Sequence, residues 1–162
     1  MNMENITVTE ISNVVTIYSD KSRHNRMVNR GSYGLSFCKE GQITYIQNGS
    51  EYISNKDCAI ILPKGGTYFI KRDKAGEFPV INFDCLDFLC DTITVIPVRN
   101  AEELISDYER MKKLFGFDGS RTKIFSIFYG MLHKLCSDDV PRELRSAVRL
   151  ISNDYSDMAT IQ

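Results

Sequence analysis

The chain has 162 residues, with 20 Lys and Arg against 21 Asp and Glu, and its formal net charge is −1. A content of 43% hydrophobic and 25% charged residues is typical of one globular domain with or without an appendage, and excludes a disordered or fibrous chain. Residues 1–98 carry 10 basic and 11 acidic side chains, and residues 99–162 carry 10 of each. Because neither part is basic, the composition excludes a free-standing nucleic-acid-binding surface within these residues.

The sequence contains neither a membrane-spanning segment nor a secretion signal. No stretch approaches the roughly 18 apolar residues that a transmembrane helix needs, and the N-terminus lacks the apolar core of a signal peptide. The cysteines form no C-x-x-C pair, which indicates neither a zinc knuckle nor a thioredoxin-like site. We therefore expect a reduced, cytoplasmic protein that uses its cysteines as small apolar residues. They are Cys38, Cys58, Cys85, Cys90 and Cys136.

Short β-rich runs separated by turn residues make up the first 98 residues. The strongest local signal is Asn48-Gly49, because both residue types accept the positive φ angles of a type I′ hairpin turn. Residues 63–66 and 74–77 predict further turns. So many short strands at this spacing predict a sandwich or a barrel. The predicted strands are residues 6–9, 14–18, 33–38, 42–47, 51–54, 58–62, 67–72, 79–85 and 92–98.

Helical spacing replaces this pattern from about residue 99. Asn100 and Glu103 form a capping-box arrangement, and Gly116 can end the first helix. A second helix is predicted after Gly119, and a third near residue 139 with Pro141 in its first turn. The apolar positions are Ala101, Leu104, Ile105, Tyr108, Met111 and Phe115 in the first helix, Ile124, Phe125, Ile127, Phe128, Met131, Leu132 and Leu135 in the second, and Leu144, Ala147, Val148 and Ile151 in the third.

The second of these helices has an unusually wide apolar stripe. One edge of the stripe can pack on the first helix while the other stays free for a partner. Four of its residues follow one another at 4-3-4 spacing, which is typical of a seam between helices. We therefore predict a homodimer with a seam formed by Ile124, Phe128, Met131 and Leu135.

Common catalytic motifs are absent from the sequence. It contains no G-x-S-x-G, no G-x-G-x-x-G after a strand, no Walker lysine and no H-E-x-x-H. The two histidines are His24, in a polar stretch, and His133, three residues before Cys136. A structural zinc site needs four ligands, so this pair predicts no metal site. An enzyme is therefore poorly supported, and we predict no catalytic residues.

A basic cluster, Lys21, Arg23, His24, Arg26 and Arg30, falls within ten residues. One interpretation is a solvated basic arm. The other is an anion site in which Arg30, at the mouth of the barrel, contacts a carboxylate or a phosphate. The aromatic side chains of the strands either fill the barrel as core or line a small-ligand site with their hydroxyls as orienting groups. The candidate ligand-binding residues are Arg30, Tyr33, Phe37, Tyr45, Tyr52, Tyr68 and Phe83.

The order of these features is similar to that of a known family. Arg30-x-x-Tyr33-x-Leu35-x-Phe37-x-x-x-Gly41, the hairpin, Cys58-Ala59-Ile60-Ile61-Leu62-Pro63 and Val80-Ile81-Asn82-Phe83 resemble the cupin-type regulatory domain of AraC-family bacterial transcription regulators. The predicted helices resemble that family's dimerisation helices. The run Leu144-x-x-Ala147-Val148-x-x-Ile151-x-x-x-Tyr155 is similar to the first helix of the family's DNA-binding domain.

The resemblance implies both a fold and a function. The fold would be mainly β plus α: a cupin-like barrel, that is a double-stranded β-helix or jelly roll, followed by three helices. Residues 1–98 would form the barrel with an N-terminal arm (1–30), residues 99–138 the dimerisation helices, and residues 139–162 a linker and the first helix of a DNA-binding domain. The chain would sense an effector (a sugar, carboxylate or amphiphile) inside the barrel, form a homodimer, avoid membranes, and reach DNA only through a domain beyond Gln162.

One motif departs from the cupin enzymes. Pro63-x-Gly65-x-x-Tyr68 resembles the second cupin motif but has Tyr68 where the enzymes carry a metal-binding histidine, and residues 33–37 lack the H-x-H pair of the first motif. The resemblance therefore implies a barrel without metal, cofactor or catalysis. Two alternatives stay open: a metal-dependent cupin enzyme such as a sugar isomerase, and a ligand-independent dimerisation module whose barrel is filled by its own side chains.

Overall fold

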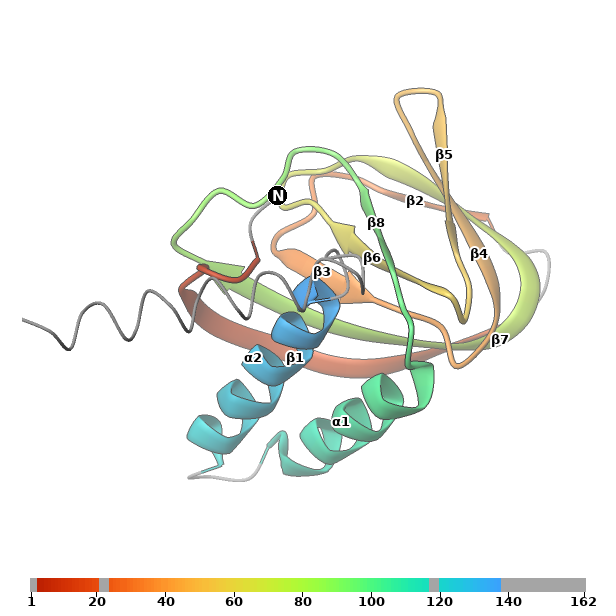
Figure 1. The fold of residues 1–162 in the computed structure, drawn as a ribbon. Coiled ribbons are helices and arrows are strands. Elements are labelled where there is room, and N and C mark those ends of the chain that lie inside the picture. The colour runs from red at the N-terminus through yellow and green to blue at the C-terminus, as the bar shows by residue number, and fades with distance from the viewer. Residues whose placement is uncertain (1–2, 21–23, 117–119, 138–162) are drawn as a thin grey trace, which may run out of the picture.

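The structure, a computed structural model, describes residues 3–20, 24–116 and 120–137. These residues form one curled antiparallel sheet that makes a nearly closed barrel, with two helices against its outside (Figure 1). The third helix predicted from residue 139 lies outside the described residues. Neither of the two described helices is long and apolar enough to cross a membrane. The elements are β1 (Val8–Ser19), β2 (His24–Met27), β3 (Tyr33–Ser36), β4 (Glu40–Gln47), β5 (Ser50–Ser54), β6 (Cys58–Leu62), β7 (Tyr68–Cys85), β8 (Thr94–Pro97), α1 (Ala101–Leu114) and α2 (Arg121–Ser137).

Strand β7 holds the sheet together. The strand order is β5-β4-β7-β3-β6-β8, and β1 and β2 also pair with β7. The first half of β7 pairs with β2 and β4, and the second half pairs with β1 and β3. The turn predicted at residues 74–77 is therefore wrong, because the chain continues there as one strand. A Cβ on Gly76 would lie 1.8 Å from the carbonyl oxygen of Glu40, so this glycine permits a close approach of β4.

The N-terminal residues belong mainly to the sheet. The two predicted runs at 6–9 and 14–18 are joined into β1, and register shifts between Val8 and Glu10 and between Ile11 and Asn13 absorb the polar residues between them. Strand β2, which pairs with residues 68–71, was not predicted because its four residues are almost all polar and exposed. Much of the predicted N-terminal arm is thus ordered strand.

Several local predictions are confirmed. Asn48 and Gly49 have φ angles of 51° and 81°, and they connect the paired strands β4 and β5. The side chain of Asn100 caps α1, accepting a hydrogen bond from the Glu103 N–H at 3.1 Å. Gly116, with a φ of 93°, follows the end of α1. These features depend on a few neighbouring residues, which explains why the sequence predicts them.

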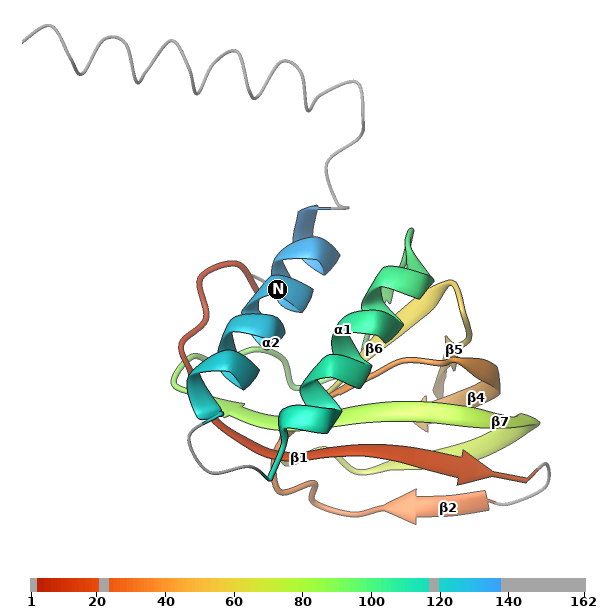
Figure 2. The ribbon, with the colours of Figure 1, turned by 90° about the horizontal axis from the view of Figure 1, so that it is seen from below.

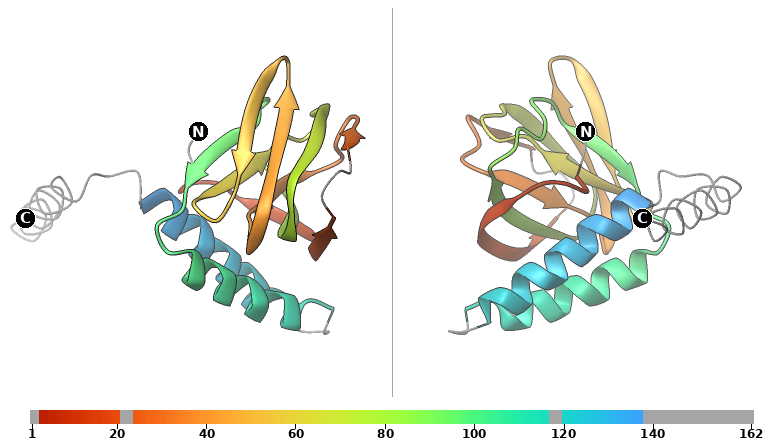
Figure 3. Two further views of the ribbon diagram at one scale, coloured as in Figure 1. Left: turned by 90° about the vertical axis from the view of Figure 1, so that its right-hand side faces the viewer. Right: turned by 60° about the vertical axis from the view of Figure 1, so that its left-hand side comes forward.

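The sheet separates two apolar cores, because successive side chains of a strand point to opposite faces. On one face, Leu35, Ile61 and Ile81 pack with the helices. On the other, the interior core brings together side chains from around the barrel: Ile43, Tyr45, Ile60, Leu62, Tyr68 and Phe78, with Met27, Tyr52 and Ile70 at its edge. The helices lie along one side of the barrel, outside it (Figure 2, Figure 3). The interior core is therefore out of contact with α1 and α2.

The predicted dimer seam of α2 is buried within this chain. Ile124, Phe128, Met131 and Leu135 are 6%, 0%, 0% and 3% exposed, respectively. They belong to the core between the helices and the sheet, where the rings of Phe128 and Phe83 lie 4.9 Å apart. This corrects the interpretation of these residues as a seam. An apolar stripe fits a partner helix and the chain's own sheet equally well, and here the sheet covers it.

Substitution of Phe128 tests whether the apolar stripe of α2 packs on the sheet of its own chain. Phe128→Ala should lower the free energy of unfolding by about 3–5 kcal/mol, because it leaves a cavity in a fully buried site. Phe69→Ala, at a side chain that is 54% exposed on β7, should cost less than about 1 kcal/mol. Urea unfolding of both variants measures the two values. Equal, small losses would contradict the packing of α2 on the sheet.

Candidate functional site: a cationic barrel interior

Polar side chains share the barrel interior with the apolar residues. They come from four strands and from the segment between β2 and β3. We call this group the interior polar cluster: Arg30, Ser36, Tyr45, Ser54, Tyr68, Arg72 and Asn82. The charge of Arg30 needs an explanation, because burying a charge is costly unless a partner compensates it.

Arg30 is fixed from several directions. Its backbone N–H donates to the Gly66 carbonyl at 3.0 Å, and its own carbonyl accepts from the Gly65 N–H at 2.7 Å. Its guanidinium donates to the Tyr68 hydroxyl at 3.2 Å and to the side-chain oxygen of Asn82. Among the described residues both side-chain partners are neutral, and its buried Nε has no hydrogen-bond partner. The positive charge of Arg30 is thus held in place without a carboxylate.

Gly34 provides the space for this guanidinium. A Cβ at position 34 would lie 2.5 Å from a terminal nitrogen of Arg30. Any larger residue would therefore push the arginine away from Tyr68 and Asn82. The glycine of strand β3 is in this way part of the site.

Both tyrosines of the cluster stay protonated. Burial raises the pKa of Tyr45 to about 12, although the Ser36 hydroxyl and the charges of Arg30 and Arg72 act in the opposite direction. Burial likewise raises the pKa of Tyr68, against the effect of Arg30. Neutral phenols cannot compensate the charge of a guanidinium, so the interior near Arg30 remains electropositive.

Two further side chains complete the cluster. Arg72 is 9% exposed and pairs in register with the interior residue Ile43. Ser54 lies on the other side of Ile43, is fully buried, and its hydroxyl has no hydrogen-bond partner among the described residues. Buried hydroxyls are normally satisfied. The Ser54 hydroxyl is therefore, like the Arg30 Nε, a buried polar atom without a hydrogen-bond partner among the described residues.

The structure separates the predicted ligand-binding residues into two groups. Arg30, Tyr45, Tyr68 and, at the edge, Tyr52 belong to the interior. The others face the helices: the ring of Phe37 lies 5.4 Å from Tyr108, Phe83 packs on Phe128, and the Tyr33 hydroxyl accepts from the Leu89 N–H at 3.3 Å. Tyr33, Phe37 and Phe83 are therefore corrected to core residues under α1 and α2.

Sequence reasoning missed Ser36, Ser54, Arg72 and Asn82. A signal for Arg72 was present, since it follows Tyr68 and Ile70 at a spacing of two and so shares their face of the strand. Asn82 alternates with the apolar residues Ile81 and Phe83, a pattern that is typical of a strand with one face in water. Only the curvature of the sheet turns that face inward.

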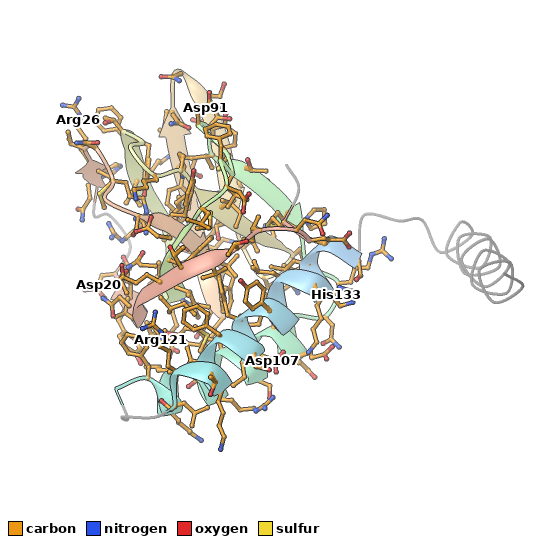
Figure 4. All side chains as sticks on the ribbon, turned by 90° about the vertical axis from the view of Figure 1, so that its left-hand side faces the viewer. Asp20, Arg26, Asp91, Asp107, Arg121 and His133 are labelled. Atoms are coloured by element: carbon orange, nitrogen blue, oxygen red, sulfur yellow. The ribbon has the colours of Figure 1, made fainter. Side chains whose placement is uncertain are left out.

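The rest of the basic cluster lies elsewhere. His24 and Arg26 are exposed on β2. The Cζ atom of Arg26 lies 5.5 Å from the centre of the Phe69 ring, over its face. Figure 4 places Arg26 on the side of the barrel opposite the helices, far from His133 on α2. Lys21 and Arg23 lie outside the described residues. No group of three or more His, Cys, Asp or Glu in the described part of the chain is arranged to hold a metal ion.

Fold and site together define an antiparallel β-barrel domain with two helices on its outside and an electropositive interior. No protein-family model and no curated protein matches the sequence. Among solved structures, the chain is similar to ToxT from Vibrio cholerae. The apo K231A variant of ToxT, from strain SCE256, is 12% identical with a TM-score of 0.58, and the match covers 77% of this chain and 55% of that one.

Two other ToxT structures agree. ToxT from strain O395 is 15% identical with a TM-score of 0.51, covering 75% of this chain and 54% of that one. The 1.65 Å structure in the P21 crystal form is 12% identical with a TM-score of 0.54, covering 80% and 57%. The chain thus spans little more than half the length of ToxT. At these identities the likeness is one of fold.

Tyr45 gives a pH-dependent test of the interior. Below about pH 9 its hydroxyl is protonated in both the folded and the unfolded chain. Between its ordinary pKa of 10.0 and its folded value of about 12, the unfolded chain releases the proton first, so stability falls as pH rises. From about pH 9 to about pH 11.5 this group should remove about 2 kcal/mol from the free energy of unfolding.

Comparison with two variants isolates this contribution in urea unfolding. Tyr45→Phe should lose the contribution and show a flatter alkaline decline than the wild-type chain. Tyr18→Phe, at a 69% exposed position on β1, should retain the wild-type slope. An unchanged slope in Tyr45→Phe would show that its hydroxyl is not held in a desolvated interior.

Proposed function

We propose that the chain is the regulatory portion of an AraC-type transcription regulator, with a cupin-like barrel that binds a small anionic effector. The family resemblance of the strand and helix patterns supports the class, as does the likeness in fold to the N-terminal domain of ToxT, an AraC-family regulator. Since the chain spans about half of ToxT, DNA binding is assigned to a further domain of a longer protein.

The observation that carries the effector proposal is Arg30. Its guanidinium lies in the barrel with two neutral partners and one unsatisfied nitrogen. A carboxylate can accept two parallel hydrogen bonds from such a group, and charge-assisted bonds of this kind are about twice as strong as neutral ones. A small carboxylate is therefore the effector that the interior fits best, ahead of an uncharged sugar.

The position of Asn82 suggests how binding would reach the helices. Asn82 accepts a hydrogen bond from Arg30 inside the barrel, and the next residue, Phe83, contacts Phe128 of α2 on the outside. An effector that takes over the guanidinium changes the contacts of β7 directly beside α2. Such coupling operates if the effector binds one arrangement of β7 and α2 more tightly than the other.

One observation favours the alternative of a ligand-independent module. The interior side chains Tyr45, Ile60, Tyr68 and Phe78 are between 0% and 3% exposed. They fill much of the barrel themselves. An effector must therefore displace part of this packing or enter beside Arg30, which is only half-buried.

A stability screen tests the proposal. The wild-type chain is heated with acetate, citrate, octanoate and inorganic phosphate, and with glucose and galactose as uncharged probes. An anion that binds the barrel should stabilise the chain by about 2.7 kcal/mol at 100 times its dissociation constant. Arg30→Met should abolish this stabilisation, whereas Arg26→Met, which removes an exposed arginine of β2, should preserve it.

Three results would count against this function. If no anion in the screen stabilises the chain, the result supports the ligand-independent module, whose barrel is filled by its own side chains. An anion that stabilises Arg30→Met as well as the wild-type chain binds elsewhere. Stoichiometric iron, nickel or zinc in the purified chain, found by elemental analysis, would support the alternative of a metal-dependent cupin enzyme.

A further inference from the structure

The segment between β7 and β8 displays two bulky apolar side chains to solvent. Leu86 and Phe88 are 76% and 77% exposed, which makes them the most exposed of the large apolar residues in the described ranges. With Asp87 between them they form what we call the apolar loop. Single exposed apolar side chains are common, whereas two within three residues make this segment a candidate contact surface.

Hydrogen bonds connect the apolar loop to the segment before β1. The Leu86 N–H donates to the Thr7 carbonyl at 2.9 Å, and the Thr7 N–H donates to Asp87 Oδ2 at 2.8 Å. Immediately after the loop, Leu89 and Cys90 are buried in the core under the helices. A loop fixed at both ends loses little conformational entropy when its side chains enter a partner, which favours binding.

A groove with the opposite character lies on the helices. It has a volume of about 560 Å³ between the C-terminal half of α1 and the N-terminal half of α2. Leu114 and Ile127 give it an apolar floor, and Arg110 and Lys123 make it cationic. We call it the helix groove; its lining is Arg110, Leu114, Thr122, Lys123, Ser126 and Ile127.

The two surfaces are complementary in charge. The loop carries the carboxylate of Asp87, whose only hydrogen-bond partner among the described residues is the Thr7 N–H. In the groove, Arg110 is 65% exposed and reaches Asp107, a carboxylate already bound by Lys134 at 2.7 Å. The helix groove thus combines an apolar floor with positive charge that can bind a carboxylate. The apolar loop combines two apolar side chains with a carboxylate.

We propose that the helix groove receives the apolar loop of a second copy of this chain. In a two-fold dimer each copy contributes one loop and one groove, so the contact occurs twice. Phe88 and Leu86 would lie on Leu114 and Ile127, with Asp87 near Arg110 and Lys123. This surface differs from the buried stripe of α2, and it is independent of the barrel effector.

Sedimentation of the 162-residue chain tests the proposal, with circular dichroism as the check of folding. The wild-type chain should form dimers, and Phe88→Ser should raise the dissociation constant at least about 30-fold, the effect of losing a central anchor. Tyr18→Ser, a matched change at another exposed aromatic residue, should leave it within about threefold. Lys123→Glu should weaken the dimer as Phe88→Ser does, whereas Lys56→Glu, on an exposed turn outside the groove, should not.

Mixing two variants provides the decisive measurement. Phe88→Ser retains its groove and Lys123→Glu retains its loop, so a mixed dimer has one intact contact whereas neither variant alone has any. The mixture should sediment faster than either variant by itself. Sedimentation of the mixture as monomers would overturn the pairing of loop and groove. A wild-type chain that is monomeric at every concentration would overturn the second copy as occupant and leave the groove to a different partner.

Discussion

The architecture depends on one strand that serves two halves of the sheet. Because β7 runs without interruption over 18 residues, its first half pairs with β2 and β4, and its second half pairs with β1 and β3. The close approach of Gly76 to Glu40 permits this continuity. A turn at this place would divide the barrel into two separate sheets. The interior polar cluster would be divided as well, since Tyr68 and Arg72 lie in the first half of β7 and Asn82 in the second.

The alternation of side chains along this strand creates two environments with different tasks. Outward-facing Ile81 and Phe83 attach the helices, so they carry much of the stability of the domain. Inward-facing Tyr68, Arg72 and Asn82 build a polar interior that costs stability, because hydrogen bonds and charges are desolvated there. Under the proposed function, this polar interior is the part of the barrel that binds an anion.

Charged contacts attach the helices to each other and to the barrel. Asp107 of α1 is buried and forms ion pairs with Lys134 of α2 and with Arg110. Lys39 joins Glu77 of β7 to Glu109 of α1, at 3.0 Å from each. With the apolar stripe of α2 covered by the sheet, these contacts leave the cationic helix groove as the side of the helix pair that faces outward. A helix pair can therefore be fully packed and still present a binding surface.

The sequence by itself determined the features that depend on neighbouring residues: the hairpin at Asn48-Gly49, the cap at Asn100, the end of α1 near Gly116, and the succession of strands and then helices. It also singled out Arg30, Tyr45 and Tyr68. Only the tertiary structure decided which side of each strand faces the barrel interior, because the alternation of β3 and β7 is the same whichever face curls inward. For that reason Phe37 and Phe83 belong under the helices, Asn82 lies beside Arg30, and Arg72 lies beside Ile43. The stripe of α2 is covered by the chain's own sheet.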